Sequence, residues 1–379
     1  MHASGPYGKL AALLILGKMM SLKIKGLDGL RGISVLLVIM SHAVIWPVIG
    51  VTNPALLSVL SPHVGVSIFF VLSGFLITFL LIREKEATGK IDIFSFIKRR
   101  ALRIFPLYYL AILFLAIMDV TGKAGITNCI YPYALTYTIN FVPKACAFSA
   151  MSHFWSLSVE EHFYLFWPII FAFGKRTAIA TISLLVFGCL YFGTSLYEPT
   201  TLYYLGRWTF PAMLPILVGC LVAFVCNVDH IKKTFSSPTI SGILLISIVA
   251  GLTAPAFIKS ETAWLVSVGA LVLYIYHNQE SLLVKLLELK PLVAVGIISY
   301  GLYVWQGVFT GNGTYRTGHV FPPSVDIGVW LTFVVAPLSY LFFEKPLLKL
   351  KKKYSWQEKK SQDDKIFSAE KLTTATKPD

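Results

Sequence analysis

Long apolar stretches dominate the sequence, and they constrain its fold more than any other feature. Hydrophobic residues make up 56% of the 379 residues, and the mean hydropathy is +0.70, well above that of a soluble domain. A helix needs about 20 apolar residues to cross about 30 Å of hydrocarbon. The sequence therefore predicts an all-α polytopic membrane protein with about ten transmembrane helices, in windows at 32–50, 63–82, 106–120, 155–173, 177–194, 211–226, 238–257, 262–277, 292–309 and 325–343.

The basic residues predict the orientation of these helices. Lys and Arg in short loops stay on the cytoplasmic side of a membrane. If the N-terminus is inside, all but five of the 33 basic residues fall on the inner side, the exceptions being Lys123, Lys144, Arg207, Lys259 and Arg316. We therefore expect both termini to be cytoplasmic. The formal net charge of +14 follows from this topology and requires no nucleic-acid partner.

The chain divides into three predicted parts. Residues 1–25 contain a run of only about eight apolar residues, too weak for a secretory signal, and are expected to form a cytoplasmic extension. Residues 26–347 contain the predicted spans. Residues 348–379 are polar, charged and rich in Lys, which predicts a disordered cytoplasmic tail.

Arg31 and His42 are ionisable residues in an apolar stretch, where such residues are costly and usually functional. They are eleven positions apart, about three helical turns and about 16 Å, so both side chains lie on one helix face. With Arg31 at the inner interface, His42 would lie near mid-membrane. A neutral imidazole can act as a general base or accept an acyl group. The structural alternative is a hydrogen bond from His42 to a neighbouring helix.

Two further polar clusters flank the predicted spans. Arg100 and Arg103 are spaced i, i+3, share a helix face and suit an anionic ligand such as phosphate, although positive-inside bias and lipid head groups also explain such clusters. In "MSHFWSLSVEEHFYLFWP", His153, Glu160 and Glu161 enter a span, and a carboxylate there could orient an imidazole or bind sugar hydroxyls. The alternative is a structural Glu paired with Arg207.

The five cysteines show no metal-ligand spacing, and we expect no metal site. Cys129 and Cys146 both fall in the outer loop between the third and fourth windows. In an oxidising compartment they could form a disulfide, with two free thiols as the alternative, because spacing alone does not show that the sulfurs meet.

Seven segments together resemble one family. They are "LDGLRG", "FFVLSGFLIT", "RRALRIFPLYY", "HFWSLSVEEHFY", "GRWTFPAMLPILVGCLVAF", "ISYGLYVW" and "FFEKP". In order and spacing, over about residues 26–347, they resemble the membrane acyltransferase-3 family of bacterial sugar and polysaccharide O-acyltransferases. The length is similar to the stand-alone form without a fused SGNH domain.

The resemblance implies roles for individual residues. Arg31 and His42 correspond to the central functional pair of the family, Arg100 and Arg103 to arginines associated with the acyl donor, and Glu160 to the motif carboxylate.

Two positions depart from the family pattern. Gln306 stands where many relatives have His, so we place no acid–base role there, and His162 stands where many have Gln.

The function that the resemblance implies is transfer of an acyl group, expected to be acetyl, from cytoplasmic acyl-CoA to a hydroxyl of an extracytoplasmic glycan at the bacterial plasma membrane. Acyl-CoA is then a co-substrate, and no permanently bound cofactor is expected. His42 acts as base or acyl carrier, Arg31 orients the imidazole or holds the donor, and Trp155, His153 and Arg207 are candidates for the acceptor site. The alternatives are a transporter or flippase for a glycan or acylated product and a non-catalytic membrane scaffold.

Overall fold

The computed structural model describes residues 24–124, 126, 128–143, 146, 150–195, 207–237, 239–240, 243, 261–311, 321–351 and 354. These residues form helices and loops and contain no strand, which confirms the all-α prediction. The longer helices are α2 (Leu27–His42), α5 (Pro62–Thr88), α6 (Ile93–Val120), α8 (Trp155–Ala172), α9 (Lys175–Ser195), α12 (Leu214–Val225), α15 (Glu261–His277), α18 (Ser299–Thr310) and α19 (Val325–Ser339). The shorter ones are α3 (Ile45–Val48), α4 (Pro54–Val59), α7 (Tyr131–Leu135), α11 (Thr209–Ala212), α13 (Asp229–Phe235), α16 (Leu282–Leu287), α17 (Lys290–Ile297), α20 (Lys345–Lys351), the 3₁₀ turns η1 (Asn128–Ile130), η2 (Ile139–Phe141) and η4 (Ser152–Phe154), and the π-helical turn η7 (Tyr340–Glu344).

Several of these helices are long and apolar enough to cross a membrane. Within the described ranges, α5, α6 and the continuous helix Val325–Leu350 meet this criterion singly. Two bent pairs, α12 with α13 at 105° and α17 with α18 at 69°, raise the number to five. The ten-span topology and the cytoplasmic termini stay predictions. The window 238–257 and both chain ends lie almost wholly outside the described residues.

The structure corrects three of the expected helix windows. The window 292–309 is two helices, α17 and α18, bent by 69°. The window 32–50 is not one helix, because α2 ends at His42 and the chain turns at Val44, which has a φ of 56°. His42 is therefore the last residue of α2. The window 106–120 also begins too late: α6 starts thirteen residues before Pro106, so Pro106 lies inside the helix.

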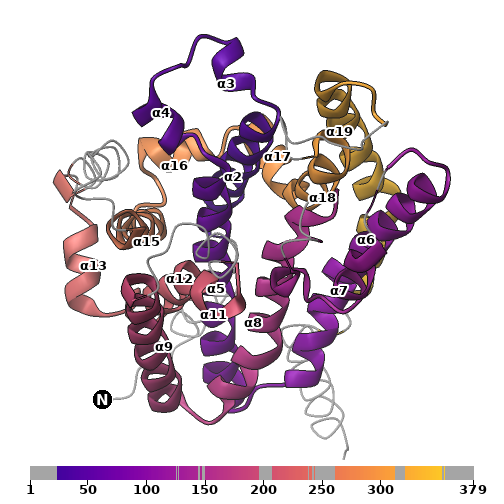
Figure 1. Ribbon diagram of the computed structural model, residues 1–379. Helices are drawn as coiled ribbons and strands as arrows, with labels where there is room; N and C mark the ends of the chain where they lie inside the picture. Colours follow the sequence, from indigo (N-terminus) through magenta and orange to yellow (C-terminus); the bar gives the residue numbers. More distant parts are fainter. Residues whose placement is uncertain are drawn as a thin grey trace, which may run out of the picture.

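Helix α2 lies at the centre of the bundle, and α3 and α4 project from one end of it (Figure 1). Small residues let its neighbours approach closely, as is common between membrane helices. A Cβ at Gly296 of α17 would lie 1.8 Å from the carbonyl oxygen of Asp28. Similarly, a Cβ at Gly74 of α5 would lie 1.9 Å from the carbonyl oxygen of Ile216 on α12. These contacts fix the helices that surround the site.

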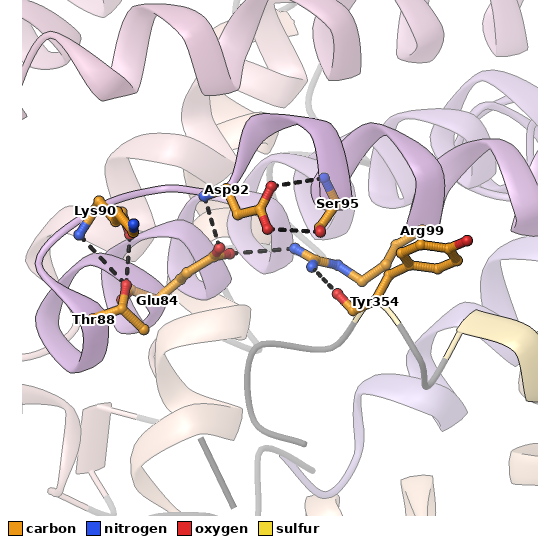
Figure 2. Close-up of polar contacts among 7 residues, drawn as sticks. All are labelled: Glu84, Thr88, Lys90, Asp92, Ser95, Arg99 and Tyr354. Atoms are coloured by element: carbon orange, nitrogen blue, oxygen red, sulfur yellow. Dashed lines mark hydrogen bonds and ion pairs between the residues drawn. The ribbon is translucent and has the colours of Figure 1, made fainter. Parts of the chain in front are cut away.

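The turn between α5 and α6 is held by a polar cluster (Figure 2). Arg99 forms an ion pair with Glu84, with 3.2 Å between Nη2 and Oε2, and also donates to the carbonyl oxygen of Tyr354 at 2.5 Å. Glu84 Oε1 accepts from the backbone N–H of Asp92 at 3.0 Å. Asp92 in turn caps α6 by accepting from the N–H of Ser95 at 2.9 Å. The start of α6, which carries the basic cluster, is therefore rigidly attached to the end of α5.

Candidate active site

A pocket of about 430 Å³, counted with its opening, lies between α2, α5, α8 and α18. The apolar part of its wall comes from α5 and α8. Polar side chains from all four helices project into it, a combination typical of ligand-binding sites. They include Arg31, Ser73, Ser156, Glu160, Tyr300 and Tyr303.

Glu160 is oriented by a short chain of hydroxyl groups. Ser73 Oγ donates to Glu160 Oε1 at 2.6 Å, and Tyr164 Oη donates to Ser73 Oγ at 3.1 Å. Tyr164 lies one turn after Glu160 on α8, so the chain returns to the helix from which it starts. The Arg31 guanidinium lines the same pocket. The structure thus brings together a cation and a carboxylate that the sequence separates by 129 positions.

The basic cluster, Arg100 and Arg103 on α6, is not part of the pocket wall, but both arginines are close enough to the pocket residue Glu160 for their charges to interact. The Arg100 guanidinium stacks over the rings of Phe96 and Tyr164, at 5.5 and 5.4 Å from their centroids. Its Nε is buried and has no hydrogen-bond partner among the described residues. Arg103 is close enough to Arg31 and Arg100 for their charges to interact. Arg31, Arg100 and Arg103 therefore concentrate positive charge around Glu160.

His42 is not part of the pocket wall. Its Nδ1 is 3.0 Å from Oε1 of Gln306 on α18. Gln306 follows the pocket residue Tyr303 by three positions, about one helical turn. Ser41, the residue before His42, donates to the carbonyl oxygen of Leu60. The end of α2 is thus attached to the start of α5, and this fixes the position of the imidazole.

The three predicted acceptor-site residues have different environments. The Arg207 guanidinium lies 5.8 Å from the centroid of the Trp155 ring and is near enough to His42 to interact with it electrostatically. His153 is only 6% exposed, and its two ring nitrogens face the carbonyl oxygens of Ala150 and Val304 at 3.1 and 3.0 Å. The structure therefore brings Arg207 near His42, with the Trp155 ring against Arg207. It also brings His153 near His42, although both ring nitrogens of His153 face backbone carbonyls.

The match to a family model covers most of the chain. The model of acyltransferase family 3, described as an acyltransferase domain, matches residues 24–344. The chain belongs to the acyltransferase 3 family. This confirms the family predicted from the seven sequence motifs and, with the apolar helices, the prediction of a membrane protein.

Named relatives of this acyltransferase 3 protein are O-acetyltransferases. It is 30% identical to "O-acetyltransferase OatA" of Staphylococcus aureus (strain NCTC 8325 / PS 47), over 86% of this chain and 57% of that protein. It is 27% identical to "Putative peptidoglycan O-acetyltransferase YrhL" of Bacillus subtilis (strain 168), over 86% of this chain and 55% of that protein. The chain thus spans little more than half the length of these relatives. No solved structure matches it significantly.

Two residues that the sequence left without a role acquire contacts in the acyltransferase 3 fold. Gln306 contacts the imidazole of His42. His162 Nδ1 lies 2.6 Å from the hydroxyl of Thr209, to which Asn140 Nδ2 also donates at 2.9 Å, and its ring stacks on Phe141 with centroids 5.8 Å apart. His162 therefore joins α8 to η2 and α11. Neither contact was visible in the sequence, because each partner is distant along the chain.

Cys129 and Cys146 form a disulfide, with their Cα atoms 6.0 Å apart. The bond closes the segment that connects α6 to α8, outside the pocket. The other three cysteines are buried and free. Across the described ranges, no group of three or more His, Cys, Asp or Glu side chains is arranged to hold a metal ion.

Proposed function

We propose that this protein is an integral membrane O-acyltransferase, which moves an acyl group, expected to be acetyl, from cytoplasmic acyl-CoA to a hydroxyl of an extracytoplasmic glycan. The site would lie in the bacterial plasma membrane. Membership of the acyltransferase 3 family and the names of the O-acetyltransferase relatives support the reaction class.

The observation that carries the proposal is the polar path from the basic cluster to His42. Arg100 and Arg103 lie near Glu160. Arg31, Glu160 and Tyr303 line the pocket, and Gln306, one turn of α18 after Tyr303, contacts His42. Such a path through a low-dielectric bundle costs free energy, so its polar groups are best explained by a ligand that uses them.

The charge distribution suggests how acyl-CoA would bind. Guanidinium groups bind phosphate oxygens well, so the phosphates of the donor would lie at Arg100 and Arg103. The pantetheine arm would then extend through the pocket past Glu160 and Arg31 and bring the thioester towards His42. Tyr303 and its hydrogen-bond partner Ser156, 2.5 Å apart, would have to accommodate the arm at the end of the pocket.

The chemical step would use His42 as the base. The imidazole takes the proton of the acceptor hydroxyl while the hydroxyl oxygen attacks the thioester carbonyl carbon. The C–S bond then breaks, and the imidazolium returns the proton to the departing sulfur, which yields free CoA and the O-acyl ester. In a two-step version, His42 accepts the acyl group first and passes it to the acceptor. Arg207, near His42, and Trp155, whose ring lies against Arg207, would bind the acceptor.

The test is thiol release by the purified full chain in lipid nanodiscs, with acetyl-CoA as donor and polysaccharide from the source cells as acceptor. We expect saturable release of free CoA, reduced at least about 100-fold in His42→Ala. The matched control is His230→Ala, because His230 is an exposed histidine on α13. A transporter or scaffold would release no thiol, and that result would refute the proposal.

A further inference from the structure

The contact between Gln306 and His42 has chemical consequences for the imidazole. Gln306 is completely buried, and its Oε1 lies 3.0 Å from His42 Nδ1. An amide oxygen only accepts hydrogen bonds, so the proton between the two atoms belongs to Nδ1. In a neutral imidazole the other nitrogen, Nε2, then carries the lone pair.

The contacts of the Gln306 side chain are made by its amide oxygen, Oε1. Thr310 donates to the backbone carbonyl of Gln306 at 2.7 Å, and its hydroxyl also lies 3.4 Å from Gln306 Oε1. Gln306 Nε2 has no hydrogen-bond partner among the residues that the structure describes. The contact of Oε1 with His42 is therefore the one that fixes the direction of the side chain.

The turn of α18 that carries Gln306 is itself held firmly. Tyr303 hydrogen-bonds to Ser156 on α8, and Trp305 Nε1 donates to Ser339 Oγ on α19 at 3.0 Å. Directly after Gln306, Gly307 leaves room for the His153 ring, since a Cβ there would lie 2.1 Å from His153 Nδ1. These contacts hold the backbone around Gln306 in place, so that its side chain stays against His42 at the end of α2.

We propose that Gln306 is a positioning residue that holds His42 as its Nδ1–H tautomer, so that Nε2 is the atom available to the reacting groups. The Gln306 amide does not titrate, so it orients His42 without exchanging a proton with it. The role in catalysis rests on the proposed function of His42, whereas the tautomer can be measured without any reaction.

The direct test is ¹⁵N NMR of protein labelled with ¹⁵N-histidine, in which the His42 signals are identified by their loss in His42→Asn. We expect a protonated Nδ1 and an unprotonated Nε2 in the neutral ring. A protonated Nε2 would overturn the proposal, because the amide would then present its N–H to Nδ1.

Two variants of similar length separate positioning from packing. Gln306→Met removes the acceptor, and Gln306→Glu keeps one. We expect Gln306→Met to lose the tautomer preference and to lower kcat by about 10- to 100-fold, with KM for acetyl-CoA within about twofold. We expect Gln306→Glu to keep the tautomer and to restore kcat to within about tenfold of the original.

Equal kcat in Gln306→Met and the original protein would refute the positioning role, as would equal losses of kcat in both variants. If Gln306→Met fails to fold, the ¹⁵N signals of the original protein still decide the tautomer. Full activity of His42→Ala would instead overturn the catalytic role of His42, and absence of thiol release from the original protein would overturn the proposed function. Either result leaves the tautomer measurement standing, so these failures are distinguishable from failure of the tautomer proposal.

Discussion

Removal of the Arg99 side chain is predicted to destabilise the fold through the α5–α6 turn. Arg99 and Glu84 form an ion pair whose side chains are only 13% and 2% exposed, as Figure 2 shows. In Arg99→Met the Glu84 carboxylate stays buried and keeps the Asp92 N–H as a partner. Removing one member of a buried pair costs about 3–5 kcal/mol. We take about 3 kcal/mol, because of that remaining partner.

The assay is thermal unfolding of the purified protein in detergent, and 3 kcal/mol corresponds to a fall in Tm of roughly 5 °C. Arg83→Met is the matched control, because Arg83 pairs with Glu86 at 3.8 Å and the two side chains are 26% and 60% exposed. Such exposed pairs contribute at most about 1 kcal/mol. A double-mutant cycle with Glu84→Gln should give a coupling of about 1.5–3 kcal/mol. Equal shifts in Arg99→Met and Arg83→Met would refute the reasoning.

Arg99 and the adjacent Arg100 are predicted to have different functions, which Arg99→Met and Arg100→Met can test. At a temperature where it is folded, Arg99→Met should bind acetyl-CoA with an unchanged KM, because its guanidinium is already occupied by Glu84 and Tyr354. Arg100→Met should raise KM for acetyl-CoA by at least about tenfold, the effect of losing a hydrogen bond to a charged group. The opposite pattern would mean that Arg99, not Arg100, contacts the donor.

Three more predictions concern the pocket and its surroundings. Ser73→Ala removes the hydrogen bond to Glu160 and should lower thiol release about 10- to 100-fold, whereas Ser73→Thr should restore it. Unchanged release in Ser73→Ala would show that activity does not depend on the orientation of Glu160 by Ser73. Gly74→Leu should abolish detergent-stable expression, because even a Cβ would lie 1.9 Å from a backbone oxygen of α12. Gly122→Leu, where nothing lies within 4 Å but φ is +71°, should cost only the strain of a left-handed backbone, about 1–2 kcal/mol, and should still be expressed. Normal yield of Gly74→Leu would contradict the packing. Reduction of the disulfide, or Cys129→Ser, should lower the stability by about 3 kcal/mol in a Tm measurement, and reductant should have no further effect on the variant.

The sequence predicted the all-α class, because a membrane helix must satisfy its backbone internally and carry a long apolar stretch. The boundary of α2 was wrong, because the break at Val44 occurs within apolar residues and leaves no signal in hydropathy. The predicted start of α6 was also wrong, because the first turns of the helix are basic and extend it beyond the apolar window.

The candidate site was only partly visible in the sequence. Arg31, His42 and Glu160 are unusual because ionisable groups in apolar helices are rare. Their contacts were not predictable, because Ser73 and Gln306 are neutral residues whose importance depends on tertiary neighbours 87 and 264 positions away. His153 has the same residue type as a catalytic base, and only its burial against two carbonyl oxygens shows that it faces no open site.

The most direct test of the central claim is the acyl content of surface polysaccharide, measured by NMR in cells that lack this protein. These cells are complemented with the original sequence, with His42→Ala or with His230→Ala, expressed at equal levels. The account predicts that the original and His230→Ala restore the acyl signal and that His42→Ala does not. Full restoration by His42→Ala would show that the imidazole is structural and would contradict the mechanism built on it.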